Sequence, residues 1–254
     1  MIHDFWDQLT DFAPSQVDCT LARVFDALGA LVQADNVFWA VVVRVVDGSR
    51  AAFDHELGWR VQSIEAWRPP LPSKTSRRVA PSRAARTGGI PAGFIAPAVT
   101  RGAGRFRVHQ LYGGADARTE PPGPKGDPKT VSDRLWVVFP VTADVESYFV
   151  LDRTATGARF STSDAALAAS ALRGIKWFHR QLLLSHGLVA AQRPLTTTER
   201  RVVRLLLTEQ TEKEIAQALD LGFDTAHKHV IAIYRKFGVR SRTGLMALWL
   251  GGRG

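Results

Sequence analysis

The feature that most constrains the fold is a pair of short helical patterns near the C-terminus, separated by residues that suit neither helix. They lie in TEKEIAQALDLGFDTAHKHVIAIYRKFGV, residues 211–239. The first pattern opens at Thr211, which forms a capping box with Glu214, a frequent start signal of helices. The sequence DLG ends it, and Gly222 is a tolerable N-cap for the second pattern. Two such helices joined by a tight turn predict a helix-turn-helix unit.

The second of these helices has an apolar side and a polar side. Its apolar residues recur at steps of 4, 3 and 4 and face one core: Ala226, Val230, Ile233 and Phe237. The major groove of B-DNA is about 12 Å wide and accepts one helix, whose early residues reach base edges. His227 and Lys228 are placed for base contacts, and Lys213, Tyr234 and Arg240 are among those placed for phosphates. The predicted DNA-contacting residues are Thr211, Lys213, Thr225, His227, Lys228, Ile231, Tyr234, Arg235, Lys236, Arg240 and Arg242.

Four blocks in this region resemble the LuxR-type (GerE-like) helix-turn-helix. They are LTTTERRVVRLLL, EKEIAQAL, TAHKHVIAIYRKFGV and SR, in the order and spacing of that family. The resemblance covers about 55 residues and implies a transcription regulator that binds double-stranded DNA. It implies that five residues lie on the DNA-facing helix: Thr225, His227, Lys228, Ile231 and Tyr234. It also assigns five residues to a common framework: Glu199, Val230, Lys236, Val239 and Arg242.

The chain departs from the usual family pattern at four positions. Glu209 stands where a turn glycine is usual, and Ala226 stands where valine is usual. Glu212 replaces the usual asparagine, and His227 stands where lysine is common. The last two changes reduce positive charge near DNA. The operator sequence therefore cannot be carried over from the family.

The N-terminal part of the sequence predicts a mixed α+β domain. Apolar residues at helical spacing indicate a helix at 16–33, and segments rich in β-branched and aromatic residues predict strands at 36–46, 134–141 and 146–153. The piece 105–112 is a candidate further strand. This order of elements resembles small sensor domains of the GAF or PAS type, by architecture alone.

The expected domain organisation has three parts. Residues 1–186 form the sensor-like α+β domain, which ends in one long exit helix at 162–186. Residues 187–194 form a linker, because Gly187 ends a helix and Pro194 does not continue one. Residues 195–254 form the all-α helix-turn-helix domain, which opens with a capping box of Thr196 and Glu199. The segments 68–104 and 113–129 are expected to be loops.

Composition limits the partners. The formal charge is +9, and the basic excess is divided between residues 68–130, with 12 Lys/Arg against 3 Asp/Glu, and residues 194–254, with 10 against 6. A basic chain favours a polyanionic partner. The Arg-rich segment 77–107 is interpreted as a solvated loop, with a second DNA-contacting surface or an acidic-ligand surface as the alternative. The single cysteine, Cys19, is consistent with a reducing compartment, and we expect a cytoplasmic protein without membrane contact.

No enzymatic motif, metal site or cofactor signature is found, so we expect no catalysis, no metal and no cofactor. Four aromatic residues on the expected strands are weighed as core against a small-molecule pocket: Trp39, Trp136, Phe139 and Tyr148. A homodimer is expected, with the helix around 165–184, including Trp177, and the stretch 244–250 as candidate surfaces. The alternative function is a protein-interaction adaptor whose basic helical tail binds a partner protein.

Overall fold

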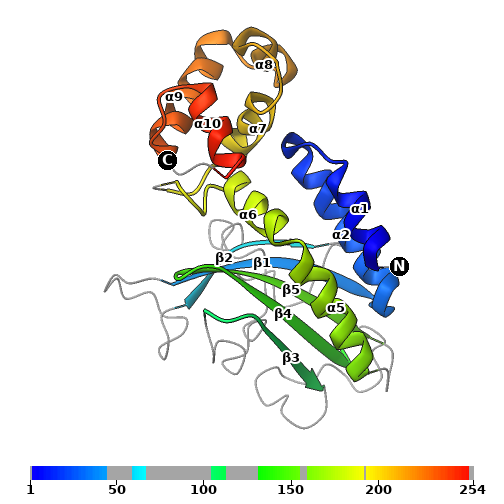
Figure 1. Ribbon diagram of the computed structural model, residues 1–254. Coiled ribbons are helices and arrows are strands. Elements are labelled where there is room, and N and C mark those ends of the chain that lie inside the picture. The colour runs from blue at the N-terminus through cyan, green and yellow to red at the C-terminus, as the bar shows by residue number, and fades with distance from the viewer. Residues whose placement is uncertain are drawn as a thin grey trace, which may run out of the picture. The chain divides into compact units, whose positions relative to one another are not determined.

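The chain is described by a computed structural model over residues 2–44, 59–66, 104–112, 131–154, 159–191 and 193–251 (Figure 1). Its internal contacts divide it into two compact units. One comprises Met1–Phe5 and Ala22–Gly174, and the other comprises Trp6–Leu21 and Ile175–Gly254. Within the described ranges, each helix is too short or too polar to cross a membrane.

The first unit is built on one antiparallel sheet. Its strands are β1 (Asn36–Arg44), β2 (Trp59–Ala66), β3 (Arg107–Tyr112), β4 (Asp133–Thr142) and β5 (Val145–Arg153). The strands lie in the order β2-β1-β5-β4-β3, and every neighbouring pair is antiparallel. The strands predicted from the sequence are confirmed as β1, β3, β4 and β5. Strand β2 is not among the predicted strands, because the segment WRVQSIEA mixes charged and apolar residues and lacks a dense β-branched run.

The centre of the sheet is buried on both faces. Successive residues of a strand point to opposite faces, and β1 is buried continuously from Val37 to Val42. On one face, Phe149 of β5 meets Phe25 of α2 (Val17–Val32) edge to face, with ring centroids 6.3 Å apart. Helix α5 (Thr162–Gly174) packs against β4. The helix expected at 16–33 is confirmed as α2.

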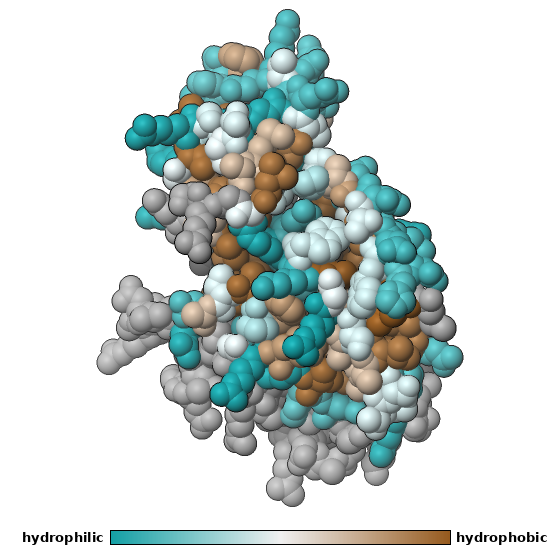
Figure 2. All heavy atoms as spheres, in the orientation of Figure 1, coloured by the Kyte–Doolittle hydropathy of each residue, from teal (hydrophilic) through white to brown (hydrophobic). Residues whose placement is uncertain are grey.

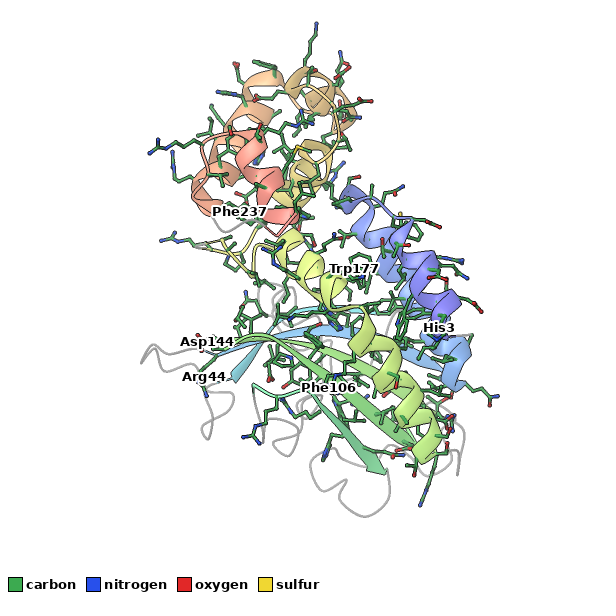
Figure 3. The ribbon with its side chains drawn as sticks, viewed as in Figure 1. His3, Arg44, Phe106, Asp144, Trp177 and Phe237 are labelled. Carbon is green, nitrogen blue, oxygen red and sulfur yellow. The ribbon has the colours of Figure 1, made fainter. Side chains whose placement is uncertain are left out.

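The turn between β4 and β5 is tied to the end of β1. The amide of Arg44 donates to the carbonyl of Asp144 at 2.8 Å, and their side chains lie 4.0 Å apart (Figure 3). Because both side chains are about half exposed, this ion pair adds little stability. The backbone bond fixes the register at this end of the sheet. The antiparallel pairing of β4 with β5 confirms that 134–141 and 146–153 form a hairpin.

The second unit contains the C-terminal helices α6 (Lys176–Ser185), α7 (Thr197–Leu206), α8 (Glu212–Ala218), α9 (Phe223–Phe237) and α10 (Arg242–Trp249). The N-terminal elements α1 (Ile2–Thr10) and η1 (Pro14–Gln16) complete the list of helices in the described residues. The core of the C-terminal helices includes Phe237 of α9 (Figure 3). Its ring meets that of Trp249 of α10 edge to face, with centroids 5.6 Å apart. The chain thus combines an α+β N-terminal part with an all-α C-terminal part, as the sequence predicts.

The prediction of a single long helix at 162–186 is wrong. It is divided into α5 and α6 at Ile175, which has φ −103° and ψ 41° rather than helical angles. Gly174 lies at the break, and glycine is a weak helix former. A new turn then begins, because the amides of Phe178 and His179 both donate to the carbonyl of Ile175. The apolar spacing continues across the break, so periodicity alone did not reveal it.

Gly187 ends α6, as the sequence predicts. It has φ +66°, a left-handed conformation that favours glycine. Its amide donates to Leu184, and the amide of Leu188 donates to Leu183, both at 2.9 Å. These bonds satisfy carbonyls that the last helical turn leaves open. The loops expected at 68–104 and 113–129, apart from Gly104, and the Arg-rich segment before residue 104 lie outside the described residues.

Candidate nucleic-acid interface

The turn between α8 and α9 is held by local bonds that the sequence encodes. The hydroxyl of Thr211 accepts from the amide of Glu214, whose carboxylate accepts from the amide of Thr211 at 2.7 Å, so the predicted capping box is confirmed. Helix α8 ends as the amide of Leu221 donates to Ala216 at 2.9 Å. Gly222 then caps α9 in an extended conformation, as predicted. The angle between the two helices is therefore set by short-range contacts.

Helix α9 has one buried row and one exposed row. The predicted core residues Ala226, Val230, Ile233 and Phe237 are at most 4% exposed. On the other side, the structure brings together exposed residues from the predicted DNA-contacting set: Thr225, His227, Lys228, Ile231 and Arg235. Ile231 is 43% exposed, although it is apolar. The part of the helical domain seen in Figure 2 is mainly hydrophilic, with apolar side chains scattered over it.

The remaining predicted DNA-contacting residues divide into exposed residues and partly buried residues. Thr211, Lys213 and Arg240 are exposed. Tyr234, Lys236 and Arg242 are partly buried. The last two have head groups bound within the domain, so the structure does not group them with the exposed row of α9.

Lys236 is held by α7. Its ammonium donates to the carboxylate of Glu199 at 2.6 Å and to the carbonyl of Pro194 at 3.0 Å. The same carboxylate accepts from the amide of Thr196, in the capping box that the sequence predicts. Burial raises the pKa of Glu199, but the bonds from Lys236 and Thr196 outweigh it and the net pKa is lowered. This arrangement matches the framework role that the family resemblance implies for Glu199 and Lys236.

Arg242 has a similar role at the start of α10. Its Nε donates to the carbonyl of Leu206 at 2.8 Å, and its Nη1 donates to the carbonyl of Gln210 at 2.6 Å. These carbonyls lie at the end of α7 and just before α8, where the backbone has no helical partner. The guanidinium therefore joins α10 to the end of α7 and to the loop before α8, and its geometry favours a framework role over a phosphate contact.

Two contacts of the exposed row were not foreseen from the sequence. The Nδ1 of His227 lies 2.8 Å from the carboxylate of Glu212, at the start of α8. The His227 ring also stacks on Phe223, with centroids 6.3 Å apart and planes 12° apart. Glu212 and His227 are two separate departures of the sequence from the family pattern. That both positions depart from the pattern together is the sequence signal that could have indicated their contact. Phe223, which is 54% exposed, gave no sequence signal of its contact with His227.

The four aromatic ligand candidates of the sheet lie on two different faces. Trp39 and Phe139 share the face that carries Phe149, since Trp39 pairs with Phe149 and Phe139 pairs with Ser147. The indole of Trp39 donates to Ser147 at 2.9 Å. Trp136 and Tyr148 alternate onto the opposite face. One pocket on a single face of the sheet would therefore hold at most two of the four.

The face with Tyr148 also contains a buried charged cluster. Glu146 is fully buried and accepts two bonds from Arg107, both at 2.8 Å, and one from the hydroxyl of Tyr148 at 2.9 Å. The amide of Gly104 supplies a fourth bond at 2.7 Å. Burial, followed by the charge of Glu146, raises the pKa of Tyr148, so the phenol stays neutral. The cluster is satisfied internally and connects β3 to β5.

One comparison with known proteins, a family match, agrees with this interpretation of the C-terminal helices. Residues 193–249 match the family described as bacterial regulatory proteins, luxR family. No curated protein gives a significant match to the chain. Two solved structures align over nearly the whole chain at 12% identity. One is SdiA in complex with octanoyl-rac-glycerol, with a TM-score of 0.45; the alignment covers 100% of this chain and 96% of that chain. The other is Escherichia coli SdiA, with a TM-score of 0.41; the alignment covers 98% of this chain and 96% of that chain.

The family match and the exposed row of α9 lie in the same helices. The match ends at Trp249, the last residue of α10, and includes both capping boxes. Residues 193–249 of this chain therefore form a LuxR-type DNA-binding helix-turn-helix domain.

Proposed function

We propose that the protein is a sequence-specific transcription regulator in which α9 enters the major groove of double-stranded DNA. The observation that carries this proposal is the division of α9 into a buried row and an exposed row that includes His227, Lys228 and Arg235. A single helix fits the groove and reads bases with its early residues. Lys213 and Arg240 supply phosphate contacts that position the helix.

The test uses the full-length protein and a duplex that it selects from a randomised oligonucleotide library. Lys228→Ala should weaken binding to that duplex by about 10- to 100-fold, because a good base contact is worth about 1–3 kcal/mol. Lys176→Ala, which removes an exposed lysine of α6, is the matched control and should bind like the wild type. Both variants should keep the wild-type melting temperature.

Equal affinities of the Lys228 variant and the wild type would contradict the assignment of the exposed row. If no duplex is selected while the protein is folded, the regulator proposal fails. The adaptor function, in which the basic domain binds a partner protein, would then be the better interpretation.

The proposal includes a homodimer. One helix-turn-helix domain contacts little DNA, and two domains on half-sites about one helical turn apart supply the missing affinity. In the stretch 244–250, the apolar residues Leu245, Leu248 and Trp249 belong to the domain core, but Met246 is 39% exposed and Leu250 is 84% exposed. We propose these two side chains, one on α10 and one directly after it, as dimer contacts.

We also propose that the α+β unit controls the DNA-binding domain. The chain passes between the units after Phe5, after Leu21 and after Gly174, and at the last of these crossings the helix is interrupted. Such a connection can have two arrangements, and an effector acts only through different affinities for them. Trp136 and Tyr148 share one face of the sheet and Trp39 and Phe139 share the other, so an effector would contact one of these pairs. Deleting residues 1–160 should change affinity for the selected duplex, and identical affinities would contradict control.

A further inference from the structure

The exposed side of α9 carries a ridge of two large apolar side chains and an imidazole: Phe223, His227 and Ile231. These residues follow one another at steps of four, so their side chains are neighbours along one row of the helix. Phe223 is 54% exposed, Ile231 is 43% exposed, and the side chain of His227 is 53% exposed. Neither Phe223 nor Ile231 belongs to the apolar core of the domain. The ridge is therefore a second surface of α9 with apolar character, separate from the buried row.

The first part of the ridge is held in place by contacts within the domain. The ring of Phe223 stacks on the ring of His227, with centroids 6.3 Å apart and planes 12° apart. The Nδ1 of His227 in turn lies 2.8 Å from a carboxylate oxygen of Glu212 in α8. A side chain that is already positioned loses less conformational entropy when it meets a ligand. The start of α9 thus presents an apolar ring whose orientation is restricted before any binding.

Basic side chains accompany the ridge and indicate what covers it. Lys228 and Arg235 are exposed on α9, and Lys213 is exposed at the start of α8. These cations attract the phosphates of DNA, but phosphate contacts do not distinguish one base from another. The major groove also presents an apolar feature, the C5-methyl group of thymine, which apolar side chains contact. A row with two large apolar side chains beside several cations fits a groove that contains such methyl groups.

From these observations we propose that Phe223 and Ile231 are specificity residues that recognise thymine methyl groups in the major groove. This inference rests on the proposed function of α9. A methyl group that packs against either side chain removes apolar surface of both partners from water, which is favourable. Cytosine has no methyl group at this position, so the same side chains meet no apolar partner there. The ridge therefore favours thymine over cytosine at the positions that it contacts.

The test replaces one thymine at a time by deoxyuridine in the duplex that the full-length protein selects. Uracil keeps the hydrogen-bonding groups of thymine and lacks only the methyl group, so the replacement isolates the apolar contact. At the contacted thymines, the replacement should weaken wild-type binding about fourfold, which is the effect of one buried methyl group. Ile231→Ala should abolish this loss at one contacted thymine, and Phe223→Ala should abolish it at another. Both variants should bind the unmodified duplex more weakly than the wild type.

Val108→Ala is the matched control, because it shortens a β-branched side chain of similar exposure, 38%, on β3. It should keep the wild-type sensitivity to every deoxyuridine replacement, and melting temperatures verify that each variant is folded. The inference is overturned if the wild type binds the thymine and deoxyuridine duplexes equally at every position, or if the loss persists in both alanine variants. A loss that persists only in Phe223→Ala overturns the role of Phe223. Failure of the wild type to select any duplex instead overturns the proposed function.

Discussion

At the residue scale, His186 shows how one buried imidazole makes the helical unit sensitive to acid. The side chain is buried at the end of α6, and its Nε2 lies 2.9 Å from a guanidinium nitrogen of Arg200. Arg200 is a permanent donor, so the ring accepts and is neutral. Burial, followed by the charge of Arg200, lowers the pKa of His186 to about 3. The folded state thus excludes a proton that the unfolded chain binds near pH 6.5.

The resulting prediction concerns stability between about pH 7 and pH 5. In this window the unfolded state binds more protons, so the free energy of unfolding should fall as pH falls. His186 alone should account for a loss of about 2 kcal/mol. His186→Gln keeps a hydrogen-bond acceptor that does not titrate. In urea unfolding over the same pH window, its free energy of unfolding should fall by about 2 kcal/mol less than that of the wild type. Parallel pH profiles of the two proteins would exclude His186 as the cause.

A second prediction at this scale separates two arginines of similar sequence position. Arg242→Ala should lower the melting temperature, because it leaves the carbonyls of Leu206 and Gln210 without their partner, at a cost of about 1–3 kcal/mol. Arg240 is exposed, so Arg240→Ala should leave the melting temperature unchanged. It should reduce the slope of log affinity against log salt concentration for DNA binding by about one. Thermal unfolding and affinity measurements at several salt concentrations give both readouts. The reverse pattern would show that the two roles are exchanged.

At the element scale, two helices end at left-handed glycines in different surroundings. Gly187 after α6 has φ +66°, and Gly238 after α9 has φ +67°. A Cβ on Gly187 would lie 2.7 Å from Cγ of Leu195, whereas a Cβ on Gly238 would have nothing within 4 Å. Gly238→Ala should therefore cost only the backbone penalty of about 1–2 kcal/mol. Gly187→Ala should cost at least about 1 kcal/mol more, because of the clash. Urea unfolding measures both, and equal losses would show that Leu195 moves away freely.

At the scale of the whole molecule, the prediction concerns association. Leu250→Asp places a charge on the most exposed large apolar side chain of the described residues, so it should weaken the proposed dimer without harming the domain core. Sedimentation at micromolar concentration should give a dimer for the wild type and a lower mass for the variant. Affinity for a duplex with two half-sites should fall more than affinity for a single half-site. A wild type that remains monomeric with and without this duplex would contradict the dimer.

The sequence by itself determined the features that depend on neighbouring residues. The capping boxes at Thr196 and Thr211 require only residues three positions apart, and the buried row of α9 follows from helical periodicity. The strands β1, β4 and β5 are predictable because dense runs of β-branched and aromatic residues favour β-strands. The DNA-binding domain followed from the same local patterns and from the family resemblance.

Only the tertiary structure decided how polar groups far apart in the sequence meet. It bound Lys236 to Glu199, placed Arg242 on two carbonyls, and joined His227 to Glu212 across 15 positions. These partners depend on how the helices pack, and a residue's own type does not reveal whether its head group is already engaged. The interruption at Ile175 was hidden for a related reason: the apolar spacing continues through it, and only the backbone angles and the bonds of the next turn break the helix there.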